Sequence, residues 1–246
     1  MAEFKFPTEV VELPSKGYFY VDGHPLSSGK LEIKYMTAKE EDILTSQNLI
    51  QQGTVIDTLL QSLIVDKTVN VNDLLIGDKN AIMIASRILG YGKDYKFEYD
   101  GEEQTIDLSK LEPVDIDFKK LTKGVNQFSF KLPNSKREIT FKLLNGHDES
   151  IIESEIKARE KVSKSRGYEL TTRLKHILLS VDGNSDKSYV NNFVDNEFLS
   201  RDSLAFRAYL NDITPDINMD CSVIDSTGKE TEVAIPVTVR FFWPES

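Results

Sequence analysis

The stretch that decides the fold lies in the last third of the chain. Residues 169–183 read ELTTRLKHILLSVDG, residues 193–217 read FVDNEFLSRDSLAFRAYLNDITPDI, and residues 232–246 read EVAIPVTVRFFWPES. Apolar residues recur at helical spacing in three successive segments: Leu170, Leu174, Ile177, Leu178 and Val181; Val190, Phe193, Val194 and Phe198; and Phe206, Tyr209, Leu210 and Ile213. Three amphipathic helices are expected, which bury these faces against one another or against a sheet.

A strand is expected to follow these helices directly. Alternate residues are apolar from Val233 through Ile235, Val237 and Val239 to Phe241. Alternation of this kind is typical of a β-strand, and Pro236 places it at the edge of a sheet, because proline cannot donate to a ladder. The last third therefore predicts a helical block that ends in a hairpin packed on it.

The first 92 residues predict short strands followed by helices. Thr37 and Glu40 have the spacing of a capping box, which predicts a helix that runs to Gln52 and is closed by Gly53. Two further helices are expected over 54–64, with a strong apolar face, and over 78–89.

Residues 93–145 change to alternating patterns with turn signals. Asp100-Gly101 and the turn over 133–136 each separate two alternating segments, which predicts two hairpins. Residues 148–164 are helical by composition and mostly charged, which fits either a solvated helix or one that meets another chain. The predicted fold is α+β: an N-terminal block of strands and helices (1–92), a small inserted β unit (93–145), and a C-terminal helical block with a terminal hairpin (146–246).

The composition excludes several classes of function. The chain has 246 residues, 39% hydrophobic and 28% charged, and a formal net charge of −10. No run reaches the roughly 18 apolar residues of a spanning helix, and the N-terminus lacks the pattern of a secretory signal. The negative charge opposes binding to nucleic acid and to anionic membranes. A single cysteine rules out an internal disulfide. Protein partners remain.

No motif in the sequence predicts catalysis, a metal site or a cofactor. The acidic run 40–42 is better explained by a helix start than by paired catalytic carboxylates. The three histidines, His24, His147 and His176, lack the spacing of metal ligands. Cys221 has no neighbouring base that would make it a nucleophile. We therefore expect no enzyme activity and no cofactor.

The candidate partner-binding residues are Arg207 and the aromatic run Phe241, Phe242 and Trp243. Adjacent aromatics in a strand point to both faces of the sheet. Such residues either belong to the core or anchor an interface, and the sequence leaves both interpretations open. Asp202 is expected to cap its helix, and Arg207 to pair with Asp202 or with a carboxylate of a partner.

Two stretches resemble one protein family. The order RDSLAFRAYL, TPDI and IPVTVRFFWP, together with residues 13–66 (LPSKGYFY through QSLIVD), resembles the T4-like bacteriophage baseplate hub subunit and hub-assembly family. Together the two stretches cover about half of the chain. Members of such families often carry a Cys-x-x-Cys pair in the last hairpin. Cys221 stands alone here, so a zinc ribbon is not expected.

The resemblance implies a non-enzymatic protein of a contractile tail. It would be a component of the baseplate hub in the virion, or an assembly factor (a chaperone made late in infection) that acts in the host cytoplasm. Its partners would be other phage baseplate hub or tail proteins. The alternatives are a hub-associated hydrolase whose site is assembled only by folding, and a generic cytoplasmic adaptor protein.

Overall fold

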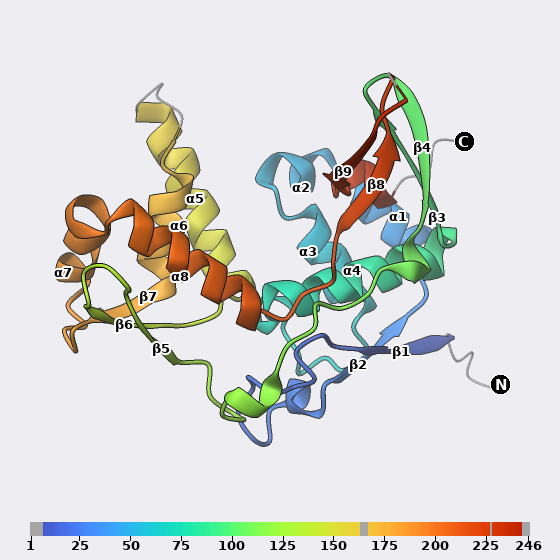
Figure 1. Cartoon of the computed structure of the whole chain (residues 1–246). Coiled ribbons are helices and arrows are strands. Elements are labelled where there is room, and N and C mark those ends of the chain that lie inside the picture. The colour runs from blue at the N-terminus through green and yellow to red at the C-terminus, as the bar shows by residue number, and fades with distance from the viewer. Residues whose placement is uncertain (1–6, 163–166, 227, 243–246) are drawn as a thin grey trace.

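The computed structural model describes residues 7–162, 167–226 and 228–242. Its helices and small antiparallel sheets form the α+β fold that the sequence predicts. Helices α1 to α4 and the hairpins around them lie on one side of the molecule, and helices α5 to α8 with a three-stranded sheet lie on the other (Figure 1). Most of the buried apolar residues of both sides belong to one continuous core.

Two strands and four helices form the N-terminal part. They are β1 (Thr8–Glu12), β2 (Lys30–Lys34), α1 (Ala38–Thr45), α2 (Gln47–Gln52), α3 (Val55–Leu63) and α4 (Ile76–Tyr91). Strands β1 and β2 pair antiparallel, with Val10 opposite Glu32. Helix α3 buries the apolar face that the sequence predicts, and its Leu59 and Leu60 are fully buried.

The predicted capping box is present at the start of α1. The Thr37 backbone N–H donates to Glu40 Oε2 at 2.9 Å, and the Thr37 hydroxyl donates to the same carboxylate. The Lys34 ammonium lies 2.7 Å from the other oxygen of Glu40. The helix predicted to reach Gln52 is interrupted at Ser46, which has an extended backbone, and Gly53 closes α2 in the left-handed conformation.

Residues 93–145 do not form one β unit, which corrects the prediction. Both expected hairpins exist: β3 (Asp94–Tyr99) with β4 (Glu102–Asp107), and β5 (Phe128–Lys131) with β6 (Glu138–Phe141). The first hairpin is a separate sheet, whereas the second gains β7 (Leu178–Val181) as a third strand. The two hairpins lie on opposite sides of the molecule (Figure 1).

The C-terminal part contains the predicted helices, with one correction. Its helices are α5 (Gly146–Val162), α6 (Glu169–Ile177), α7 (Lys187–Asn192), the π-helical η5 (Phe193–Glu197) and α8 (Ser200–Ile213). The helix predicted from Leu170 to Val181 ends at Ile177. Residues 178–181 instead form β7, where Ser180 lies opposite Thr140 of β6. The apolar run fits either period, and pairing with β6 decides for the strand.

The terminal strand is shorter than predicted and packs elsewhere. Strands β8 (Asp220–Ile224) and β9 (Glu230–Ala234) form the expected hairpin. The strand expected to reach Phe241 ends at Ala234, and Val239–Phe242 form the 3-10 helix η6. The hairpin lies beside β3 and β4, not on the C-terminal helices (Figure 1). Tyr95 Oη donates to the Pro236 carbonyl at 3.0 Å across this contact.

Helix α4 contacts segments from both the first and the last part of the described chain. Near its start, buried Asp78 accepts hydrogen bonds from Ser15 and Tyr20 of the N-terminal loop. Near its end, Arg87 Nε donates to the Phe241 carbonyl at 2.7 Å. Asp216, from the TPDI sequence, accepts from Asn80 Nδ2 at 2.9 Å. A single helix therefore orders segments from both halves of the sequence.

The chain crosses between the two sides on two adjacent segments. Val114 N donates to the Asp216 carbonyl at 2.8 Å, and Asn218 N donates to the Glu112 carbonyl at 2.9 Å. The segment that leaves toward β5 therefore pairs antiparallel with the segment that returns from α8. Within the described ranges, none of the helices combines the length and the apolar character needed to cross a membrane.

Candidate interaction surfaces

The aromatic residues proposed as partner anchors belong to the interior. Phe241 and Phe242 are both 0% exposed, and their rings pack edge-on at 5.2 Å between centroids. The Phe241 ring also packs against Tyr95 of β3, at 4.9 Å. Of the two interpretations that the sequence leaves open for Phe241 and Phe242, the structure therefore supports the core: both rings are buried beside α4, which corrects their assignment as candidate partner-binding residues. Trp243 lies outside the described residues.

Arg207, the remaining candidate, lies exposed on α8. It does not pair with Asp202, because the Asp202 carboxylate is buried and already accepts hydrogen bonds from the turn between β5 and β6. Asn134 N donates to it at 2.7 Å and Ser135 N at 2.9 Å. Burial alone would raise the pKa of Asp202, but these hydrogen bonds outweigh it and lower the pKa to about 2. Asp202 thus anchors α8 to the sheet and leaves Arg207 facing solvent.

Apolar side chains accompany Arg207 on the outer face of α8. Leu204 is 62% exposed, and Leu199, just before the helix, is 52% exposed. Arg201 is also exposed on this helix. Exposed leucines beside arginines are a composition found in protein interfaces. The composition of this face is therefore compatible with the prediction that Arg207 binds a partner protein.

A second surface feature is a groove between α5, α6, β7 and α7, which we call the basic groove. It consists of two hollows of about 320 and 360 Å³ that share Lys175, His176 and Lys187. The first is also lined by Glu155, Ala158, Arg159 and Asn191, and the second by Lys142, Asp148, Ile151, Leu178, Leu179, Ser185 and Val190. Cations from three helices and from the loop that follows β6 therefore converge on one place.

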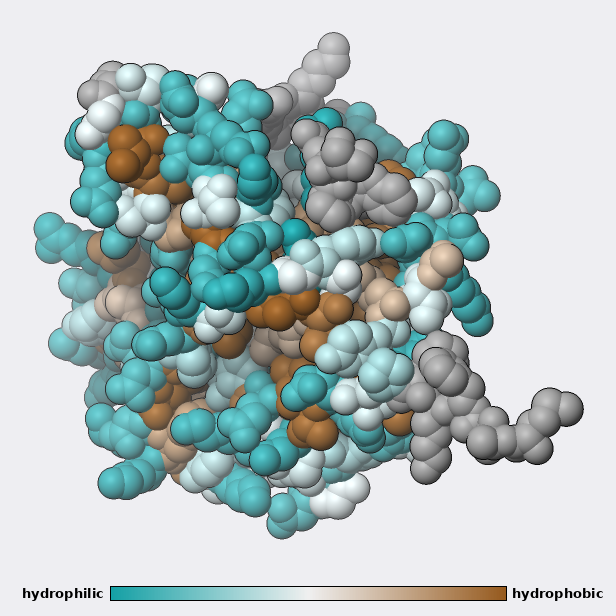
Figure 2. All heavy atoms as spheres, turned by 90° about the vertical axis from the view of Figure 1, so that its right-hand side faces the viewer, coloured by the Kyte–Doolittle hydropathy of each residue, from teal (hydrophilic) through white to brown (hydrophobic). Residues whose placement is uncertain are grey.

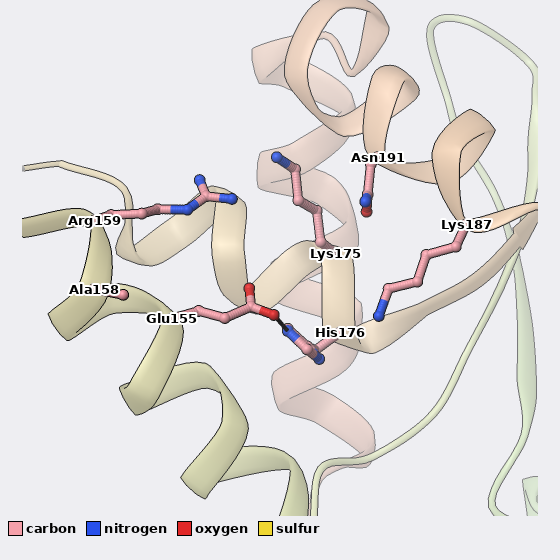
Figure 3. Close-up of a pocket in the computed structure, with 7 residues that line it drawn as sticks. All are labelled: Glu155, Ala158, Arg159, Lys175, His176, Lys187 and Asn191. Atoms are coloured by element: carbon pink, nitrogen blue, oxygen red, sulfur yellow. Dashed lines mark ion pairs between the residues drawn. The ribbon is translucent and has the colours of Figure 1, made fainter. Parts of the chain in front are cut away.

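Figure 3 shows how the side chains of the first hollow lie. Arg159 extends from α5 and Lys187 from α7 into the space around Lys175 and His176. His176 Nε2 lies 3.2 Å from Glu155 Oε1 across the hollow. This contact joins α6 to α5 across the hollow.

The buried titratable groups lie away from this groove. Asp78 is fully buried, and burial raises its pKa, although hydrogen bonds from Ser15 and Tyr20 act against this shift. Burial and the negative charge of Asp78 raise the pKa of the Tyr20 hydroxyl in turn. Neither residue lines the hollows. The hydrogen bonds of Asp78 to Ser15 and Tyr20 instead hold the N-terminal loop on α4.

The histidines and the cysteine are placed separately. His24 Nδ1 accepts from Leu26 N at 3.2 Å and shapes its turn, as expected for a residue before Pro25. His147 lies near Asp73, and His176 lines the groove. Burial raises the pKa of the half-buried Cys221 thiol. Among the described residues, no group of three or more His, Cys, Asp and Glu side chains is placed to hold a metal ion.

The groove could not be found from the sequence. Its cations lie between positions 142 and 187, on elements whose mutual arrangement depends on the pairing of β6 with β7. The sequence places Lys175 and His176 side by side, but no local pattern connects them to Arg159 or Lys187. Only the tertiary structure brings the four together.

The opposite side of the molecule has a different surface. Seen from the side of the β3–β4 hairpin, it is mostly hydrophilic, with hydrophobic side chains gathered near the centre of the view (Figure 2).

In comparisons with protein families, with curated proteins and with solved structures, no match to this chain was found.

Proposed function

We propose that this chain is a non-enzymatic protein of a contractile phage tail, either a component of the baseplate hub or a factor that assembles it. The observation that carries the proposal is the resemblance of two stretches, residues 13–66 and residues 201–244, to the T4-like baseplate hub subunit and hub-assembly family. In either role the chain works by contacts with other hub or tail proteins.

The arrangement of these two stretches supports the proposal. They lie far apart in the sequence, yet both pack on α4 and share its polar contacts: Tyr20 through Asp78, and Asp216 through Asn80. Parts of both stretches thus meet on one helix, whereas α8, which begins the second stretch, lies with the C-terminal helices.

The surface of the C-terminal part is suited to contacts with proteins. The outer face of α8 exposes Leu199, Leu204 and Arg207, and the basic groove lies between α5, α6 and α7. Hub assembly would require surfaces of this kind, because each subunit must recognise its neighbours. Both are formed by elements whose buried faces belong to one core, which favours a preorganised surface.

The test is quantitative mass spectrometry of purified particles of the phage that encodes the chain, compared with the infected-cell lysate. A fixed small number of copies per particle is expected for a hub component, and abundance in the lysate with none in the particle for an assembly factor. A nonsense mutation in the gene is expected to stop the production of complete tails. Normal tails from that mutant would refute the proposal.

A matched pair of variants then examines the α8 face. Leu204→Ser together with Arg207→Glu is expected to lower the yield of complete tails while the protein stays folded, because both side chains are exposed. Val21→Ser with Lys229→Glu makes a similar change at exposed positions elsewhere and is the control. Equal yields from the two double variants would exclude this face from assembly.

A further inference from the structure

The basic groove reverses the charge of the rest of the molecule. The chain has 40 acidic and 30 basic residues, whereas the groove is lined by the cations Lys142, Lys175, Lys187 and Arg159 and by the carboxylates of Asp148 and Glu155. Local excess of one sign in a hollow focuses the electric field there. The groove is therefore a place where an anionic group is attracted although the chain as a whole is acidic.

Only part of this positive charge is compensated within the chain. Lys142 lies 2.6 Å from Asp148, and Lys175 lies 2.6 Å from Asp195. Within the described ranges, no carboxylate lies at ion-pair distance from Lys187 or Arg159, and Arg159 instead lies over the Tyr168 ring at 5.8 Å. Two cations of the groove thus remain available to an external anion.

The groove also has an apolar part. Leu178 and Val190 are buried in its floor, and Ile151 is 50% exposed at its edge. An inorganic anion would use the cations and leave Ile151 in water. A ligand that carries both an apolar side chain and carboxylates would use both, because burial of an apolar side chain away from water is favourable.

One polar atom of the first hollow lacks a partner. The Oδ1 atom of Asn191 is buried and accepts no hydrogen bond in the described structure. Figure 3 shows this side chain on the wall between Lys175 and Lys187. A buried acceptor without a donor is unfavourable, because it has lost its hydrogen bonds to water. A peptide supplies backbone N–H donors to such an atom, whereas a free carboxylate or phosphate ion at neutral pH supplies few or none.

We propose that the basic groove binds an acidic peptide segment of a partner protein, with at least one large apolar side chain among its carboxylates. The carboxylates would pair with Lys187 and Arg159, the apolar side chain would cover Ile151, and a peptide N–H would donate to Asn191 Oδ1. Two hollows of this size hold a few side chains of a peptide. The proposed function enters only in the identity of the partner, which would be another hub protein.

The test uses a library of random twelve-residue peptides displayed on a carrier, selected against the full-length protein. Selected peptides are expected to be enriched in Asp and Glu next to Leu, Ile or Phe. Synthetic copies are then titrated by fluorescence anisotropy. The charge reversal Lys187→Glu with Arg159→Glu is expected to weaken binding by about tenfold or more, because it replaces attraction by repulsion.

Two controls separate the groove from charge in general. Lys110→Glu with Lys229→Glu makes the same change of net charge at exposed positions far from the groove, and it is expected to bind the peptides as the wild type does. The milder Lys187→Gln, with circular dichroism of every variant, covers the case in which the double reversal does not fold. Raising the salt from about 0.1 M to about 1 M is expected to weaken binding, because it shortens the Debye length from about 10 to about 3 Å.

Three outcomes would overturn the proposal: no enrichment of acidic peptides, equal affinity of the groove and control variants, or self-association of the wild type that Lys187→Glu abolishes. The last would make the groove an interface between copies of this chain, and sedimentation equilibrium would detect it. The peptide selection does not depend on whether the chain is a phage tail protein. Loss of peptide binding would therefore leave the tail-protein proposal standing, and normal tails from the nonsense mutant would leave the groove proposal standing.

Discussion

Removal of one oxygen atom, by Tyr20→Phe, tests the polar network at the start of α4. The Tyr20 hydroxyl donates to Asp78 Oδ2 at 2.6 Å and accepts from Leu75 N at 2.9 Å. Both partners are buried. The phenylalanine ring keeps the stacking of residue 20 on His24, where the centroids lie 5.5 Å apart. The substitution therefore changes two hydrogen bonds and little else.

The expected loss of stability can be worked from these two contacts. A hydrogen bond contributes about 0.5–1.5 kcal/mol, or about 1.5–3 kcal/mol where Asp78 is ionised, and a buried N–H left without an acceptor costs about 1–3 kcal/mol. Because neighbouring effects are not additive, we expect a loss of about 3 kcal/mol in the free energy of unfolding. This is a large part of the roughly 5–15 kcal/mol that holds a typical domain together.

The loss is also expected to depend on pH. Burial raises the pKa of Asp78, and the hydrogen bond from Tyr20 limits that rise. Without this donor the pKa rises further in the folded state. A carboxyl group with a raised pKa binds its proton more tightly in the folded than in the unfolded chain, so stability falls as the pH rises through that range. The difference between Tyr20→Phe and the wild type should therefore be larger at pH 8 than at pH 5.

The assay is urea unfolding followed by circular dichroism at both pH values. Tyr18→Phe is the matched control, since the Tyr18 hydroxyl makes one neutral hydrogen bond, to the Leu121 carbonyl at 3.0 Å. That variant is expected to lose only about 0.5–1.5 kcal/mol. If Tyr20→Phe were no less stable than Tyr18→Phe, the account of Asp78 as the anchor of the N-terminal loop would be refuted.

Three further predictions concern other contacts. Gly77→Ala is expected to destabilise the protein by about 1–3 kcal/mol despite the better helix propensity of alanine, because its Cβ would lie 1.9 Å from the Pro215 carbonyl oxygen; a higher melting temperature would contradict this. Phe241→Ala is expected to cost about 3–5 kcal/mol in urea unfolding, since the ring is fully buried, and a variant as stable as the wild type would place the ring outside the core. The pKa of Asp202 is lowered to about 2, so its stabilising effect is present above about pH 4 and is lost as the pH falls toward 2; Asp202→Asn should flatten this part of the stability curve.

Local signals in the sequence were sufficient for most of the helices and turns. The capping box of Thr37 and Glu40, the closing Gly53 and the Asp100-Gly101 turn each act within a few residues, so a single segment contains the whole signal. The same holds for the apolar face of α3.

Pairing between distant segments could not be predicted in the same way. Residues 178–181 were expected to continue a helix, and only their contact with β6 makes them a strand. Alternation around Phe241 was read as a strand, whereas the backbone turns into η6 where Arg87 of α4 binds its carbonyl. The partner of Phe241 lies 154 positions earlier, beyond the reach of any local pattern.

The candidate site residues also differ in how far local sequence patterns could predict them. Arg207 was predicted to bind a partner; it is exposed on α8, as the helical pattern indicates, and its binding role stays a prediction. The choice between core and interface for Phe241 and Phe242 needed the tertiary structure, and so did the basic groove. Residues that act together from separate elements give no signal until the elements are placed.

The contact between Phe241 and α4 affects the order in which this protein can fold during its synthesis. The chain emerges from its N-terminus, so α4 leaves the exit tunnel about 150 residues before Phe241, whose carbonyl accepts a hydrogen bond from Arg87 Nε. Until then the guanidinium of Arg87 and the ring of Tyr95 lack the cover of η6. These contacts can form only after residues 239–242 have been synthesised. A stalled or shortened chain would present an open apolar surface to chaperones and proteases.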